Sequence, residues 1–284
     1  MPDPSSHDFL PLAGLSIVTL AINLPGPAAA GRLRDLGASV TKIEPPDGDP
    51  LARGCPEWYR ALHEHVTVLR LDLKVASDRE RLNPILAQSD LLLTSSRPAA
   101  LERLGLSWSE VHRQFPRLCQ VAIIGHAPPD EHQPGHDLTY QATLGLVSPP
   151  EMPRALIADL GGAEEAVSTA VSLLLARERE ATAAYAQVSL AEAAARFALP
   201  YQYGLTRPAG LLGGGWPGYN LYRATDGWIA VAALEPHFAE RLRSKLGIES
   251  FTHEALETAF GRQSAAEWEA WATTRDLPIV AVRP

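Results

Sequence analysis

Five short segments of strand length, three of them apolar runs and VTVLRLDL an alternating one, constrain what the first half of this chain can fold into. Continuous apolar runs are typical of parallel strands that are covered on both faces. Segments with a helical pattern separate them, and this alternation predicts a doubly wound α/β sheet with right-handed crossovers. The five segments are LSIVTL (15–20), SVTKIE (39–44), VTVLRLDL (66–73), DLLLTSS (90–96) and LCQVAIIG (118–125).

Capping and breaking residues fix the expected helices between these strands. Gly37 is expected to stop the first helix, and Pro84 should lie near the start of its helix or bend it. Ser107, with Glu110 three residues later, has the pattern of an N-cap. The predicted helices cover residues 28–37, 77–89, 97–106 and 107–116.

The second half begins with the strongest predicted helix, residues 162–180, whose acidic start and basic end match the helix dipole. A strand at 185–190 and a helix at 191–200 follow. From Thr206 a Gly- and Pro-rich linker changes the character of the chain. We therefore predict a large domain over residues 1–205 and a smaller one over 206–284. The smaller domain should hold a strand at 227–234 and helices at 238–246, 252–260 and 265–273.

Composition narrows the class of protein. Of the 284 residues, 46% are hydrophobic and 20% are charged, as in soluble globular proteins. The formal net charge of −8 argues against a nucleic-acid-binding surface. Leu10–Gly31 is uncharged, but its acidic leader and interrupting prolines argue against a signal or membrane segment. Cys55 and Cys119 have no metal-binding or disulfide spacing, and Cys119 is expected to be buried, so a reducing, cytoplasmic setting is predicted.

The stretch from Pro134 to Gly162 carries the candidate chemistry. It delivers an imidazole, His136, and a carboxylate, Asp159, each at the edge of a regular element, with the loop-forming SPPEMP between them. Two groups of this kind facing each other across a cleft could exchange a proton with a substrate. Taken alone, His136 could be a structural loop residue, and Asp159 a helix cap. A metal site using His126, His132 and His136 is not expected, because the loop lacks a supporting ligand set.

Six segments, in order and over nearly the whole chain, resemble the family III CoA transferases, which include the 2-methylacyl-CoA racemases. The resemblance implies a Rossmann-like large domain and a small domain that act on acyl-CoA thioesters, with protomers interlocked as a dimer. Coenzyme A would enter as part of the substrate, with no permanently bound cofactor and no metal. The segments are residues 12–50, LDLK (71–74), RPAALERLGL (97–106), PGHDLTY (134–140), IADLGG (157–162) and residues 213–238.

Within this family the position of Asp159 is the catalytic carboxylate. Racemases have His just before the Asp of the GxD motif, where transferases commonly have another residue, and this chain has His136. The resemblance also implies that Glu235 supports this imidazole, although a glutamate before Pro236 is equally an ordinary helix start. Asp159, placed ahead of a helix, is expected to be favoured in its ionised form. Exposed N–H groups there or at the PGHD turn could stabilise an enolate oxygen.

The nucleotide end of coenzyme A needs positive charge or backbone N–H groups near strand ends. We expect the backbone of Leu71, Asp72 and Leu73, together with nearby cations, to supply them, although each cation could equally be a solvated surface charge. Asp137 is placed at the binding turn and is expected to hold that turn rather than act on substrate. The cations are Lys74, Arg97 and Arg103, and the turn adds Gly135, Asp137 and Tyr140.

Three hypotheses follow for function. The first is an acyl-CoA racemase or epimerase in which His136 and Asp159 exchange the α-proton and Glu235 orients the imidazole. The second is a CoA transferase in which Asp159 forms a covalent thioester. The third is a weak or inactive subunit that pairs with a related chain rather than with a second copy of itself. Pro45 and Pro46 stand where relatives often carry an arginine, and the early end of the chain favours the third hypothesis.

Overall fold

The computed structural model describes residues 9–180 and 182–283. Contacts divide the chain into two compact units, Met1–Phe197 and Ala198–Pro284, so the division falls inside helix α9 (Leu190–Gln202). Each unit has its own hydrophobic core and is described separately.

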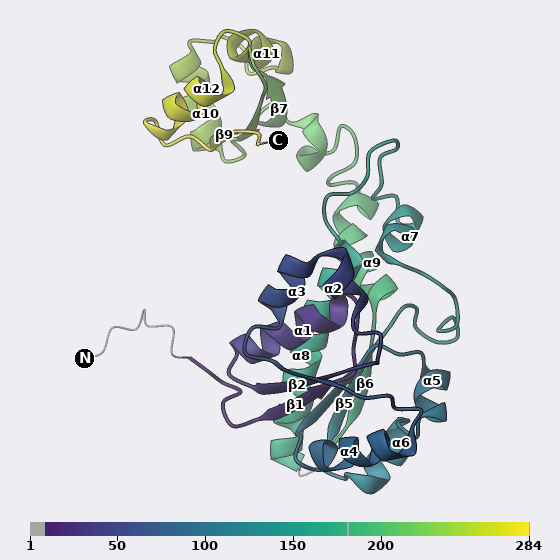
Figure 1. Cartoon of the computed structure of the whole chain (residues 1–284). Helices are drawn as coiled ribbons and strands as arrows, with labels where there is room; N and C mark the ends of the chain where they lie inside the picture. The colour runs from purple at the N-terminus through teal and green to yellow at the C-terminus, as the bar shows by residue number, and fades with distance from the viewer. Residues whose placement is uncertain (1–8, 181, 284) are drawn as a thin grey trace, which may run out of the picture. The chain divides into compact units, whose positions relative to one another are not determined.

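Unit 1 is built on a six-stranded sheet in the order β3-β2-β1-β4-β5-β6, with every neighbouring pair parallel (Figure 1). The predicted doubly wound fold is therefore confirmed. The strand order reverses between β1 and β4, and ligands of such folds bind beyond the carboxyl ends of the strands at this switch point. The strands are β1 (Ser16–Thr19), β2 (Ser39–Glu44), β3 (Thr67–Arg70), β4 (Leu91–Thr94), β5 (Cys119–Ile124) and β6 (Tyr185–Ser189).

Alternating side chains along the strands feed two separate cores, one on each face of the sheet. On β4, Leu91 and Leu93 pack against helices α1 (Pro25–Asp35) and α8 (Ile157–Glu180). Leu92 points to the other face, which is covered by α4 (Ala76–Ala87), α5 (Pro98–Arg103) and α6 (Trp108–Gln114). Because side chains on a strand alternate with a period of two, continuous apolar runs are the pattern that such a double cover requires.

The remaining helices of unit 1 agree only partly with the sequence pattern. Helices α2, α3 and α7 were not predicted, because each is short and begins at a proline or a polar turn. Gly37 ends the α1 region with φ 102°, a left-handed conformation that suits glycine. Pro84 lies inside α4 rather than near its start. The bounds are α2 (Pro50–Gly54), α3 (Pro56–Leu62), α4 (Ala76–Ala87), α5 (Pro98–Arg103), α6 (Trp108–Gln114) and α7 (Asp137–Thr143).

Unit 2 combines a three-stranded antiparallel sheet, in the order β7-β8-β9, with three helices. This confirms the predicted α+β character of the smaller part. The glycine-rich LLGGG segment forms one tight turn, η1 (Leu211–Gly215), in which Gly214 has φ 87°. The elements are β7 (Tyr219–Arg223), β8 (Trp228–Ala232), α10 (Pro236–Leu246), α11 (His253–Phe260), α12 (Ala265–Thr273) and β9 (Ile279–Ala281).

Two further expectations concern the cysteines and membranes. Cys119 is fully buried in β5, as predicted, and Cys55 is exposed, and both thiols are free. None of the helices among residues 9–180 and 182–283 combines the length and the apolar character needed to cross a membrane.

Candidate functional site

Two cavities open at the carboxyl edge of the parallel sheet in unit 1, and Ile22, just after β1, lines both. The first, which we call the His136 cavity, encloses about 280 Å³. The second, the Lys74 cavity, encloses about 240 Å³. Polar residues dominate the lining of the His136 cavity: Asn23, Ser95, Arg97, Glu131, Gln133, His136, Tyr140 and Asp159.

His136 is the residue that starts α7. Its backbone is extended, with φ −139°, and its N–H donates to Thr139 Oγ1 at 3.0 Å. The Thr139 hydroxyl in turn donates to the His136 carbonyl at 2.8 Å. The side chain is exposed and lies against the cavity, so the imidazole can reach both substrate and solvent.

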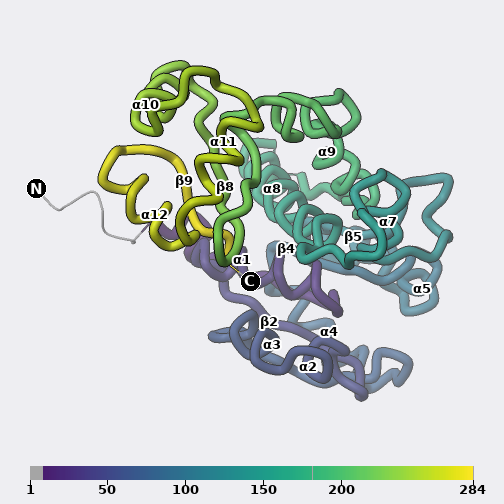
Figure 2. Tube along the Cα trace, turned by 90° about the horizontal axis from the view of Figure 1, so that it is seen from above, coloured from purple at the N-terminus to yellow at the C-terminus, as the bar shows by residue number. Residues whose placement is uncertain are grey.

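Asp137 joins the two helices that present His136 and Asp159, α7 and α8, which lie side by side (Figure 2). Its buried Oδ2 accepts the N–H groups of Ala158 at 2.8 Å and Asp159 at 3.0 Å. Its Oδ1 accepts from the side-chain amide of Gln141. Asp137 therefore holds this turn, and the N–H groups of Ala158 and Asp159, which we expected to be available to an enolate oxygen, are already bound.

Asp159 lies in the first turn of α8, not ahead of the helix as the sequence suggested, because α8 begins at Ile157. The two glycines that follow permit close packing against α9. A Cβ on Gly161 would lie 2.5 Å from the Phe197 ring, and one on Gly162 would lie 2.3 Å from Leu190 Cδ2. This packing fixes the first turn of α8, so that the half-buried Asp159 lines the His136 cavity.

The carboxyl group of Asp159 does not have the electrostatics that we expected from a helix start. Burial, followed by the negative charge of Asp137, raises its pKa from 3.8 to about 6, while His136 acts in the opposite direction. The expectation that Asp159 would be favoured in its ionised form was wrong. Asp137 accepts the N–H groups at the start of α8, so they do not stabilise the Asp159 carboxylate, and it adds a like charge. A carboxyl group with this pKa can either accept or donate a proton near neutral pH.

Tyr140 lines the same cavity as His136 and Asp159. Its ring is buried, and two glycines leave room for it: a Cβ on Gly125 would lie 2.6 Å from the Tyr140 hydroxyl, and one on Gly135 would lie 2.5 Å from the ring. Burial and the charge of Asp159 raise the pKa of the Tyr140 phenol, so it remains a hydrogen-bond donor. Gly135 and Tyr140 thus shape the cavity wall.

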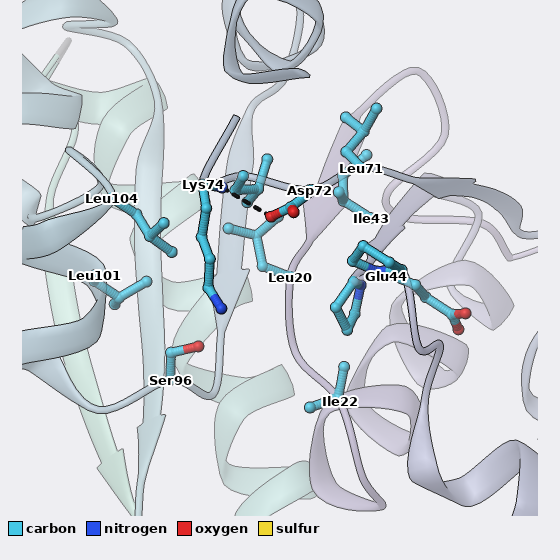
Figure 3. A pocket seen from close by; sticks show the side chains of 13 residues that line it. Leu20, Ile22, Ile43, Glu44, Leu71, Asp72, Lys74, Ser96, Leu101 and Leu104 are labelled. Carbon is cyan, nitrogen blue, oxygen red and sulfur yellow. Dashed lines mark hydrogen bonds between the residues drawn. The ribbon is translucent and has the colours of Figure 1, made fainter. Parts of the chain in front are cut away.

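The Lys74 cavity has a different chemistry. Leucine, isoleucine and proline side chains form most of its wall, and the side chain of Lys74 points into it, toward Ser96 (Figure 3). The turn that carries Lys74 is held by its own carboxylates: Asp72 N–H donates to Asp78 Oδ2 at 2.8 Å, and Lys74 N–H donates to Asp72 Oδ1 at 3.0 Å. The segment predicted to bind the nucleotide, Leu71–Lys74, therefore lines one cavity as a unit.

The other predicted site residues are distributed elsewhere. Arg97 lines the His136 cavity rather than the Lys74 cavity. Arg103 is exposed at the last position of α5. Glu235 lies in unit 2, where it precedes α10 as its N-cap residue without a side-chain capping bond. Its predicted role beside His136 stays a prediction.

A buried polar cluster around Lys42 in β2 was not predicted from the sequence. The Lys42 ammonium is fully buried and forms ion pairs with Asp49 and with Glu44, at 3.3 Å in the latter. The His63 Nδ1–H donates to the Tyr59 carbonyl at 2.6 Å, which leaves Nε2 to accept from Lys42 at 2.8 Å. The signal was present in SVTKIE, because a lysine and a glutamate two residues apart share one face of a strand.

Oxygen and nitrogen atoms of Glu44, Asp49 and His63 lie within 4.8 Å of one another, a spacing that could suit a metal ion. The Lys42 ammonium already contacts all three residues. The Lys42 ammonium therefore supplies the positive charge at the centre of these three side chains, where a metal ion would otherwise sit. Burial, reinforced by the Lys42 charge, lowers the pKa of His63, which keeps its imidazole neutral.

Comparison with known proteins identifies the family. The model of CoA-transferase family III matches residues 12–283, which covers nearly the whole chain. The chain belongs to CoA-transferase family III. The family resemblance given by the order of six segments along the chain is thus confirmed.

Members of this family carry different activities in their names. Human alpha-methylacyl-CoA racemase is 30% identical over 263 residues, which are 84% of this chain and 65% of the racemase. The acetyl-CoA:oxalate CoA-transferase of Acetobacter aceti is 25% identical over 299 residues, covering 91% of this chain and 77% of that enzyme. The chain thus spans less than two thirds of the length of the human racemase.

A solved structure confirms the fold. The hypothetical protein Rv3272 from Mycobacterium tuberculosis superposes with a TM-score of 0.82 at 23% identity, covering 96% of this chain and 84% of that one. At this identity the likeness concerns the fold alone.

Proposed function

We propose that this family III protein acts on acyl-CoA thioesters and exchanges the proton on the α-carbon, as a racemase or epimerase of 2-methylacyl-CoA. One observation carries the proposal: His136 and Asp159 line a single cavity at the switch point of the sheet, and the pKa of Asp159 is raised to about 6. The name of the human racemase relative supports the same activity.

Proton exchange would proceed in two balanced steps. One member of the pair, in its basic form, takes the α-proton, and the electrons of the broken C–H bond move onto the thioester oxygen as an enolate. The other member, in its acidic form, then returns a proton to the α-carbon, and the carbonyl re-forms. Each turnover leaves the two side chains with exchanged protonation states, which suits a carboxyl group whose pKa is raised to about 6, as that of Asp159 is.

The Lys74 cavity would take the nucleotide end of the thioester. Its apolar wall suits a flat apolar surface, and the Lys74 ammonium suits a phosphate. Because Ile22 lines both cavities, one extended ligand could occupy them together. Coenzyme A would then enter and leave with each substrate rather than stay bound.

The direct test is exchange in deuterated water. Incubation of the protein with (S)-2-methylacyl-CoA should introduce deuterium at the α-carbon, as measured by mass spectrometry, and should produce the other enantiomer. The variants H136A and D159N should each lose this exchange. An absence of deuterium at the α-carbon with all thioesters offered would contradict the proposal.

A CoA transferase is the second candidate, and the names of relatives such as the Acetobacter enzyme favour it. Ionised Asp159 would attack the thioester carbonyl, and coenzyme A would leave as a thiolate while an acyl anhydride forms on the carboxylate. Hydroxylamine trapping separates the two candidates, since only the transferase leaves a hydroxamate at Asp159. A peptide map after hydroxylamine treatment would show the modified residue.

The active assembly is also a proposal: a homodimer, or a heterodimer with a related chain. Sedimentation of the purified protein, followed by the exchange assay on the separated species, distinguishes them. A dimer active by itself would remove the need for a different partner.

A further inference from the structure

Asn23 has an unusual backbone at the rim of the His136 cavity. It lies in the loop between β1 and α1, lines the cavity, and has φ 68°. This left-handed region is sparsely used by residues other than glycine, and residues held there often occur at ligand sites. The loop therefore places an amide side chain where glycine would be the easier choice.

Hydrogen bonds from two sides hold this part of the loop. The Asn23 N–H donates to Asp49 Oδ1 at 3.1 Å, and Asp49 is itself buried and ion-paired with Lys42. On the other side, the Ile22 N–H donates to Ser95 Oγ at 3.1 Å. The buried Lys42 cluster thus gives Asn23 a fixed position at the cavity that contains Asp159.

The groups near Asn23 in this cavity are polar and of mixed charge. Glu131 has a buried carboxylate oxygen, Oε2, that has no hydrogen-bond partner among the described residues. Gln133 and Ser95 add an amide and a hydroxyl, while Arg97 opposes the negative charges. A plain hydrocarbon chain would leave these groups without partners, whereas a hydroxyl can both donate and accept.

We propose that Asn23 is a specificity-determining residue whose side-chain amide binds a hydroxyl group on the acyl chain, so that the preferred substrates are hydroxyacyl-CoA thioesters. The inference rests on the proposed function, because it places the acyl chain in the His136 cavity. A hydroxyl is favoured over a carboxylate because Glu131 and Asp159 would repel a second anion. Asp49 and Lys42 act as positioning residues for this amide.

A glycine variant tests the amide separately from the backbone. In N23G the left-handed conformation is easy for glycine, so the loop should keep its shape while the amide is lost. The matched control is H65G, which also introduces glycine at a left-handed position, since His65 has φ 58°. The His65 side chain is exposed and lines neither cavity. Thermal unfolding of both variants checks that the fold is kept.

The readout is the ratio of affinities for 3-hydroxybutyryl-CoA and butyryl-CoA by calorimetry, with succinyl-CoA as a third ligand. We expect a roughly tenfold preference for the hydroxyacyl thioester, reduced to about threefold or less in N23G and unchanged in H65G, in line with the loss of one hydrogen bond. Equal affinities in the unmodified protein, tighter binding of succinyl-CoA, or an unchanged ratio in N23G would each overturn the proposal. Deuterium exchange is scored separately, so a protein that binds selectively without exchange would contradict only the proposed reaction.

Discussion

The two cavities at the sheet edge differ in how their polar groups are used. In the Lys74 cavity, the carboxylates of Asp72 and Asp78 hold the backbone turn, and one ammonium group points into an apolar pocket. In the His136 cavity, Asp159 has a raised pKa and Glu131 has an oxygen without a partner. The first arrangement suits binding, because its carboxylates are engaged in holding the turn. The second suits chemistry, because the pKa of Asp159 is raised to about 6 and this carboxyl group can change its protonation state near neutral pH.

The comparison also shows how neighbouring carboxylates acquire opposite roles. Asp137 and Asp159 are close enough to influence each other, but Asp137 accepts two backbone N–H groups and an amide, whereas Asp159 is left with burial and a like charge. Asp137 is therefore engaged in holding the turn, and in the proposed reaction the proton-handling role falls to Asp159.

The largest expected effect is loss of chemistry without loss of binding. D159N should lower the rate of α-proton exchange by at least about a thousandfold, the range for removing an acid or base group. Its affinity for coenzyme A thioesters should change only a few-fold, since the Lys74 cavity is untouched. The control is D47N, which makes the same change at an exposed residue in the loop after β2. Losses of affinity and rate of similar size in D159N would contradict the assignment of binding to the Lys74 cavity and of proton exchange to the His136 cavity.

The second largest effect is expected from a packing change in the wall of the His136 cavity. In G135A the new methyl group would meet the Tyr140 ring at 2.5 Å, and a buried ring cannot move freely. We expect a loss of about 2 kcal/mol in the free energy of unfolding, as for overpacking, together with slower exchange. Urea denaturation measures the first quantity.

The matched control for this change is G54A, because nothing lies within 4 Å of a Cβ at Gly54. Equal stabilities of G135A and G54A would show that Tyr140 has room to move.

A smaller effect should appear in the Lys74 cavity. K74M should weaken the affinity for coenzyme A by about tenfold, corresponding to one charge-assisted hydrogen bond, with little change in the turnover rate at saturation. The loss should shrink at high salt, where screening weakens the contact. R103M is the comparison, since Arg103 is exposed at the end of α5, and we expect a smaller loss of affinity from it. Equal losses of affinity in K74M and R103M would indicate that the phosphate groups bind closer to α5.

The smallest expected effect concerns stability and its pH dependence. Because the pKa of Asp159 is raised to about 6 in the folded protein, folding favours the protonated form. The associated stability is present below pH 4 and is lost as the pH rises through 6. D159N cannot ionise, so it should exceed the original protein in stability by about 1 kcal/mol at pH 8, after allowance for partial exposure, and by nothing at pH 3.5. An equal gain in stability at pH 8 and pH 3.5 would show that the titration of Asp159 is not its cause.

The sequence predicted much of this molecule by itself. Runs such as LCQVAIIG and DLLLTSS determined a parallel sheet with two covered faces, since only strands buried on both sides need continuous apolar side chains. The order of six short segments, two of them around His136 and Asp159, predicted the family. These features are local, and each is complete within one short stretch of chain.

The electrostatics of the site depended on residues that meet only in the folded chain. The start of a helix alone suggested an ionised Asp159, and the fold reversed this by bringing Asp137 to the same N–H groups. Likewise, Lys42 looked like an ordinary strand residue until Asp49 and His63, from two other segments, surrounded its ammonium. Burial and charge proximity are properties of tertiary structure, so the sequence could name the candidate reacting groups, while only the fold decided the pKa of Asp159 and the partners of Lys42.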